Sequence, residues 1–91
     1  MKIEILTSAI DDLKIGRCFY EKQADNLGDY FLNSVLSDID SLNLYAGIHP
    51  KVFSFYRLLA RRFPYAIYYK KSQNIITVYR VLDCRQKPVK P

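Results

Sequence analysis

The chain has 91 residues, of which 49% are hydrophobic, 14% aromatic and 25% charged, and its formal net charge at pH 7 is +5. This length accommodates a single core, so we expect one domain over residues 1–91 and exclude a large multi-domain enzyme. With three Gly and four Pro, the composition is neither disordered nor collagen-like.

The charge is divided unequally along the chain. Residues 1–45 carry four basic and eight acidic side chains, a net charge of −4, whereas residues 46–91 carry ten basic and one acidic side chain, a net charge of +9. A basic half of this kind attracts nucleic acid or an acidic protein partner. The alternative is a charged surface that serves only solubility.

The cysteines and the N-terminal sequence bear on the cellular compartment. Cys18 and Cys84 have no second pair with which to build a disulfide framework, and the start lacks the apolar stretch of a signal peptide. The sequence has no apolar run long enough to cross a bilayer. We therefore expect a cytoplasmic protein with reduced thiols and no membrane contact.

The first predicted elements are a short strand and a helix. Residues 3–6 are mainly apolar, and Ser8 with Asp11 fits the N-cap and capping box of a helix over about residues 9–23. The residues expected on its buried side are Ile10, Leu13, Arg17, Tyr20 and Ala24.

A second helix is predicted directly after the first. Asn26 and Asp29 repeat the capping pattern, and the apolar periodicity ends near Gly47. The short link between the helices predicts an antiparallel hairpin. The expected buried positions are Leu27, Phe31, Leu32, Val35, Leu36, Ile39 and Leu42.

The second half predicts three strands. Residues 52–59 are dense in aromatic and apolar side chains, residues 65–69 follow a proline, and a polar turn at 71–74 precedes a strand over 75–82. Residues 87–91 resemble a polar tail. The order strand, helix, helix, strand, strand, strand predicts an α+β fold in which a helical hairpin packs on one face of a small antiparallel sheet, leaving the other face open.

Alternation along the last two strands assigns their side chains to the two faces. The set expected beneath the helices comprises Tyr65, Ile67, Tyr69, Ile76, Val78 and Leu82, and it also contains Arg80, for which the alternation offers no partner. The set expected on the open face comprises Ala66, Tyr68, Lys70, Ile75, Thr77, Tyr79, Val81, Asp83 and Arg85.

The chemistry-bearing residues favour binding by this open face. His49 is a lone histidine ahead of a proline, and neither metal-ligand spacing nor a nucleotide-binding loop is present, so we expect no metal and no cofactor. Guanidinium groups for phosphates and tyrosines for stacking are typical of an RNA-contacting surface. The alternative is that the tyrosines only fill a sheet. The candidate residues are Tyr68, Lys70, Tyr79 and Arg85, with Arg57, Arg61 and Arg62 at the rim.

Residues 57–69 (RLLARRFPYAIYY) and 75–88 (IITVYRVLDCRQKP) closely resemble the RelE/ParE superfamily of toxins from bacterial type II toxin–antitoxin systems, and residues 19–22 and 27–31 are similar to that family's helical hairpin. The resemblance implies a growth-inhibiting toxin neutralised by an acidic antitoxin, with operator DNA contacted only through the antitoxin complex. It leaves the target open: RelE-like members cleave mRNA on the ribosome, whereas ParE-like members poison DNA gyrase. An inactive relative that retains only antitoxin binding is a further alternative.

The resemblance also implies which residues would act. Ribosome-dependent members carry an arginine at the position of Ala66, and its absence argues against mRNA cleavage. If the chain is an endoribonuclease, catalysis falls to Arg57, Arg61, Tyr79 and Arg85. Antitoxin or nucleic-acid binding is expected of Arg62, Tyr68, Lys70, Asp83 and Lys87.

Overall fold

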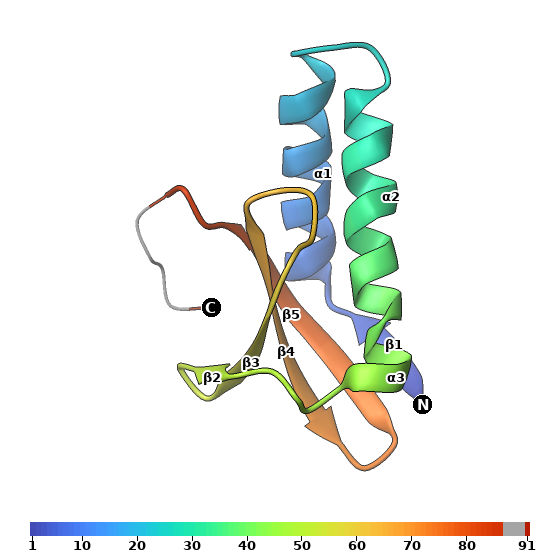
Figure 1. Cartoon of the computed structure of the whole chain (residues 1–91), viewed down its shortest axis with the longest axis vertical. Helices are drawn as coiled ribbons and strands as arrows, with labels where there is room; N and C mark the ends of the chain where they lie inside the picture. The colour runs from blue at the N-terminus through green and yellow to red at the C-terminus, as the bar shows by residue number, and fades with distance from the viewer. Residues whose placement is uncertain (87–90) are drawn as a thin grey trace.

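The computed structural model describes residues 1–86 and 91 (Figure 1). In chain order the elements are β1 (Lys2–Ile5), α1 (Thr7–Glu21), α2 (Leu27–Asp40), α3 (Leu42–Tyr45), β2 (Lys51–Val52), β3 (Phe55–Leu59), β4 (Tyr65–Ser72) and β5 (Ile75–Asp83). Of the predicted polar tail, residues 87–90 lie outside the described part. No helix in the described part is both long and apolar enough to cross a membrane.

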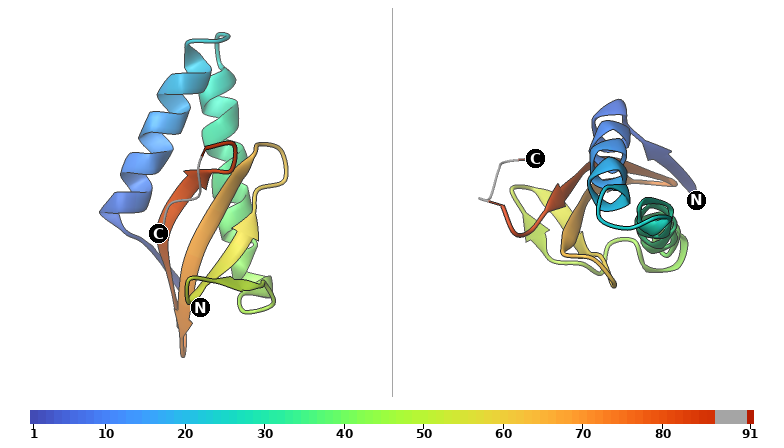
Figure 2. Two further views of the ribbon diagram at one scale, coloured as in Figure 1. Left: turned by 90° about the vertical axis from the view of Figure 1, so that its left-hand side faces the viewer. Right: turned by 90° about the horizontal axis from the view of Figure 1, so that it is seen from above.

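The two long helices form an antiparallel hairpin that covers one face of the sheet, as the sequence predicts (Figure 1, Figure 2). Aromatic rings join the two layers, because the Phe31 ring lies 5.0 Å from Tyr20, 4.9 Å from Tyr65 and 5.1 Å from Phe63, measured between ring centroids. Aromatic contacts of this kind stabilise a core beyond the area they bury. The buried core consists of Ala9, Leu13, Tyr20, Phe31, Val35, Ile39, Leu42, Tyr65, Ile67, Tyr69, Ile76, Val78 and Val81.

The buried side of α1 differs from the predicted one. Ala9 and Gly16 are buried, whereas Ile10 and Arg17, predicted to face the core, are exposed. The reason is that small residues allow a close approach: a Cβ at position 16 would lie 2.6 Å from the Phe31 ring. Leu13 and Tyr20 are buried as predicted, but Ala9 and Gly16 take the places expected of Ile10 and Arg17, so the buried stripe is rotated relative to the hydrophobic pattern.

The beginnings of the helices also differ from the predicted caps. Helix α1 begins directly after β1, because the Leu6 N–H still donates to the Val78 carbonyl at 3.0 Å. Ser8 is therefore not the N-cap, and its hydroxyl donates to the Tyr79 carbonyl at 2.6 Å. Asn26 does precede α2, but with a φ of 69° and no capping bond from its side chain.

Glu21, at the end of α1, takes over the capping of α2. Its carboxylate accepts hydrogen bonds from the backbone N–H of Asn26 at 3.0 Å and of Gly28 at 2.9 Å. These are two of the donors that the first turn of a helix leaves without intrahelical partners. Glu21 is the last residue of α1, and its carboxylate satisfies two backbone donors at the start of α2.

The sheet has five strands in the order β1-β5-β4-β3-β2. Strand β1 pairs with β5 in parallel, and the other pairs are antiparallel, so the predicted antiparallel sheet has one parallel edge. Residues 52–59, predicted as one strand, form instead the end of β2, a two-residue turn and β3. The turn residues Phe53 and Ser54 have φ angles of 53° and 69°, the left-handed pair that a tight hairpin needs.

A β-bulge in β5 changes which side chains face the helices. Tyr69 pairs with Val78 but Tyr68 pairs with Arg80, which leaves Tyr79 as an extra residue. Strict alternation is therefore lost beyond Tyr79. Val81 is consequently buried beneath the helices, whereas it was predicted on the open face. Leu82 now pairs with Ala66 and Asp83 with the buried Tyr65, each opposite to the face predicted for it, and Arg85 lies beyond the end of β5. Arg80 contacts Asp12 of α1, on the helix side predicted for it.

Candidate functional site

The face of the sheet away from the helices, here the outer face, carries an aromatic and basic group of side chains. It comes from three neighbouring strands: Arg57 pairs with Tyr68 across β3 and β4, and Lys70 pairs with Thr77 across β4 and β5. We call it the outer-face cluster, and its members are Phe55, Arg57, Tyr68, Lys70 and Tyr79.

One half of the outer-face cluster is a cation held by two rings. The Lys70 ammonium lies 4.6 Å from the centroid of the Phe55 ring and 5.5 Å from that of Tyr79. The two rings are 5.1 Å apart at an interplanar angle of 70°. Attraction of the cation to the ring faces orients Lys70 while leaving it exposed. Phe55 was not among the predicted site residues, because its place on this face depends on the unpredicted turn at residues 53–54.

The other half fixes a guanidinium. Arg57 donates from Nε to the Tyr68 hydroxyl at 3.2 Å, and its Nη2 lies 3.6 Å from the sulfur of Cys84. Tyr68 is 8% exposed and Ala66 0%, so this part of the predicted open face is closed. Tyr68 therefore positions Arg57 and offers no free ring for stacking on a base.

Arg61 and Arg62 lie exposed in the loop between β3 and β4. The backbone of this loop is tied to α2, because the Arg61 N–H donates to the carboxylate of Asp38 at 3.1 Å. Asp38 is buried, and Phe63 of the same loop packs against Tyr30 at 5.7 Å between centroids. The loop thus presents two exposed guanidiniums from a fixed backbone.

Arg85 does not join the outer-face cluster, contrary to the prediction. Its guanidinium forms two hydrogen bonds with Asp83, of 3.0 and 2.8 Å, and a third of 3.3 Å with the Tyr20 hydroxyl, and it lies 5.7 Å from the Phe19 ring of α1. The bulge explains the error, since it turns Asp83 toward the helix side. Lys87, the remaining predicted binding residue, lies outside the described residues.

The pKa values around Arg85 follow from this pairing. Hydrogen bonds from Arg85 lower the pKa of Asp83 below its ordinary value, against the opposing effect of burial. Burial, reinforced by the charge of Asp83, raises the pKa of Tyr65 to about 12. Asp83 and Arg85 are therefore both charged at neutral pH and form an ion pair with each other.

Replacing Arg85 with alanine should raise the pKa of Asp83. Because the pKa of Asp83 is lowered in the folded state, its contribution to stability is present above the ordinary aspartate value of about 3.9 and is lost as the pH falls. Carboxyl carbon NMR titration of wild type and Arg85→Ala measures this directly. An unchanged Asp83 titration would show that the pair does not form in solution.

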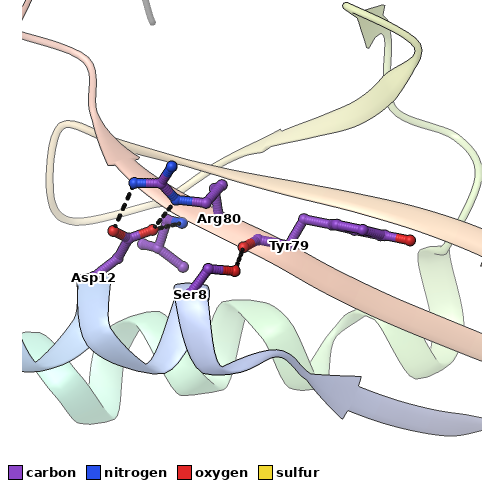
Figure 3. A network of polar contacts seen from close by, with 5 residues as sticks. Ser8, Asp12, Tyr79 and Arg80 are labelled. Carbon is purple, nitrogen blue, oxygen red and sulfur yellow. Dashed lines mark hydrogen bonds and ion pairs between the residues drawn. The ribbon is translucent and has the colours of Figure 1, made fainter. Parts of the chain in front are cut away.

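Arg80, which the sequence left without a partner, is bound to α1 (Figure 3). Its Nε and Nη2 donate to the two carboxylate oxygens of Asp12 at 2.7 and 3.0 Å, and Asp12 also accepts from the Val81 N–H at 2.9 Å. Figure 3 shows this network beside the Ser8 to Tyr79 bond, with the Tyr79 ring pointing away from it. A cavity of about 240 Å³ lies next to it, between α1 and β5.

The ion pairs decide which basic residues remain available to a partner. Within residues 1–86, the side chains of Arg80 and Arg85 are neutralised by aspartates, whereas the side-chain cations of Arg57, Arg61, Arg62 and Lys70 have no carboxylate within 4.0 Å. No carboxylate or imidazole belongs to the outer-face cluster in the described part of the chain: Asp83 is held by Arg85, and His49 bonds Tyr69 on the helix side. The cluster can bind anions, but it lacks a general base of ordinary pKa.

The position of Ala66 bears on the same question. Ala66 lies between Leu59 and Leu82 in the sheet register and is fully buried. Ala66 was predicted on the open face, but its side chain has no exposed surface. Separately, residues 1–86 contain no group of three or more His, Cys, Asp or Glu side chains that could hold a metal ion.

The arrangement of helices and strands is shared with a solved structure. A chain from the chromosomal ParDE TA system of P. aeruginosa superposes with a TM-score of 0.76 at 17% sequence identity, and the match covers 89% of this chain and 92% of that chain. The likeness confirms the predicted α+β fold with its helical hairpin on one sheet face. The sequence matches no protein-family model and no curated protein sequence.

Proposed function

We propose that this chain is the toxin of a bacterial type II toxin–antitoxin pair, that it arrests growth by binding DNA gyrase, and that an acidic antitoxin neutralises it. The fold it shares with a chain of a ParDE TA system supports the toxin class. The net charge of +9 over residues 46–91 supports an acidic partner, because opposite charges steer and strengthen association.

We choose gyrase over mRNA as the target because of the residues that make up the outer-face cluster. Cleavage at an RNA 2′-hydroxyl needs a base, an acid and a group that stabilises charge on phosphorus. The outer-face cluster offers the last of these through Arg57 and Lys70, but it has no histidine or carboxylate. Cations and aromatic rings without a base favour binding of an acidic protein surface over RNA hydrolysis.

Two assays on the intact chain test this proposal. Purified gyrase should lose DNA supercoiling activity when the chain is added, and transcripts mapped in induced cells should remain uncut. Lys70→Gln, which removes an exposed charge from the outer-face cluster, should weaken gyrase inhibition at least about fivefold, as expected for a charged hydrogen bond worth about 1 kcal/mol or more. Lys14→Gln makes the same change on an exposed position of α1 and should have no effect.

Two outcomes would overturn the proposal. Prompt transcript cuts at ribosomal A-site codons would assign the chain to the mRNA-cleaving class. If gyrase keeps its activity and transcripts stay uncut, both targets are excluded. The chain would then be an inactive relative that retains only antitoxin binding.

A further inference from the structure

The connection between α3 and β2 is attached to one buried hydroxyl. Tyr69 of β4 is fully buried, and its hydroxyl oxygen accepts a hydrogen bond from the Gly47 N–H at 2.9 Å. The same hydroxyl is hydrogen-bonded to Nδ1 of His49, whose ring packs edge-on against Tyr69 with 5.5 Å between centroids. Two residues of the connection therefore bond to a single side chain beneath it.

Proton counting determines the state of His49. The Tyr69 hydroxyl carries one proton, and since its oxygen accepts from Gly47, that proton is free to be donated to Nδ1. If Nδ1–H donated instead, the hydroxyl proton would have no acceptor among the described residues, so the tautomer that satisfies both groups is the neutral imidazole with its proton on Nε2. If His49 gains a second proton, Nδ1 becomes a donor, and the buried hydroxyl proton of Tyr69 loses its acceptor among the described residues.

The groups around His49 offer no compensation for a positive charge. Lys51 of β2 lies over the Tyr56 ring of β3, 5.0 Å from its centroid, and Lys71 of β4 passes beside Gly47. The Tyr56 ring stacks on Tyr69 at 5.1 Å, and α3 contributes Tyr45 as its only titratable side chain. Burial lowers the pKa of His49. Among the described residues, no carboxylate lies within 4.0 Å of His49 to stabilise the imidazolium.

The same connection also holds the strand that carries Arg57. The Pro50 carbonyl, next to His49, accepts the hydrogen bond of the Arg57 N–H at 2.9 Å. Pro50 directly precedes the first residue of β2, so a shift of residues 47–50 would move both the start of β2 and the backbone of β3 at Arg57. His49 is in this sense a positioning residue for Arg57, and it does not touch the outer-face cluster itself.

We propose that His49 and Tyr69 form a proton-operated latch: neutral His49 holds residues 46–50 on β4, and protonation of His49 releases them and loosens the hairpin of β2 and β3. This inference does not depend on the proposed target. It assigns a regulatory contact to the only histidine of the chain.

NMR of the full chain tests the latch. Imidazole ¹⁵N shifts should show Nδ1 unprotonated at pH 8. Between pH 8 and pH 5, the opening equilibrium at the Gly47 and Arg57 amides, measured by hydrogen exchange and corrected for intrinsic rates, should rise about tenfold, the effect of one lost buried hydrogen bond. The Ile67 and Val78 amides, in buried parts of the sheet, should keep their protection.

Two variants separate the latch from general acid sensitivity. Tyr69→Phe removes the hydroxyl and should leave the Gly47 amide poorly protected at both pH values. His49→Gln cannot titrate, so the pH dependence at Gly47 and Arg57 should disappear, which tests the proposal even if Tyr69→Phe does not fold. A protonated Nδ1 at pH 8, an unchanged Gly47 opening equilibrium in the wild type, or an equal pH response in His49→Gln would overturn it.

Discussion

Replacing Gly28 with alanine should lower the free energy of unfolding by about 3 kcal/mol, the upper end of the cost of overpacking a close contact. A Cβ at this position would lie 2.5 Å from the backbone carbonyl oxygen of Arg17 and 2.9 Å from Glu21. Backbone atoms cannot rotate away as a side chain can, so the helices would have to separate at their connected end. Urea unfolding followed by circular dichroism measures the loss.

The control for Gly28→Ala is an alanine elsewhere in the same helix. Alanine is favoured over glycine by about 1 kcal/mol in a helix interior, so the steric cost at Gly28 must exceed this gain. Asn33 is exposed in α2, and Asn33→Ala should be neutral or slightly stabilising. If Gly28→Ala proves as stable as Asn33→Ala, the helices of the hairpin do not approach as closely as the structure has them.

Asp12→Ala should lower the free energy of unfolding by about 2 kcal/mol. The substitution removes both acceptors of Arg80 and the acceptor of the Val81 N–H together. Breaking a fully buried ion pair costs about 3–5 kcal/mol, but the side chain of Arg80 keeps 32% of its exposure and recovers part of its hydration. Thermal and urea unfolding of the variant would give the value.

Asp29→Ala provides the matched comparison. Asp29 also pairs with an arginine, Arg17, at 2.8 Å, but both side chains are about half exposed. Exposed pairs of this kind contribute little, so the free energy of unfolding should stay almost unchanged. Equal losses in Asp12→Ala and Asp29→Ala would contradict the view that Asp12 joins α1 to β5 more strongly than a surface pair.

The layers of the fold could be predicted from the sequence, but its local irregularities could not. The helical hairpin follows from the apolar spacing of Phe31, Val35 and Ile39, all of which are buried. The turn at Phe53 and Ser54 could not be predicted, since neither residue is typical of left-handed backbone and both sit within an apolar run. Tyr79 likewise gives no local sign that it is an extra residue in the ladder.

These two irregularities account for what was right and wrong at the candidate site. Tyr68 and Lys70 lie on β4, opposite the bulged strand, so alternation placed them on the outer face as found. Arg57 was predicted only at the rim, and it joins the outer-face cluster through its pairing and hydrogen bond with Tyr68. Asp83 and Arg85 follow the bulge, and simple alternation put them on the wrong side. The roles of all these residues stay predictions, since their chemistry was derived from residue type and family resemblance.

The parallel pairing of β1 with β5 has a consequence for how the chain folds during synthesis. Lys2 pairs with Ile75, and Ser8 bonds to Tyr79, 71 positions later. Contacts between such distant segments slow folding, because a long loop must close before they form. On the ribosome, β1 has no partner strand until β5 has left the exit tunnel, so α1 and α2 emerge well before the sheet they cover. The helical hairpin therefore spends translation with its apolar side uncovered, a period in which a chaperone or a binding protein made nearby has access to it.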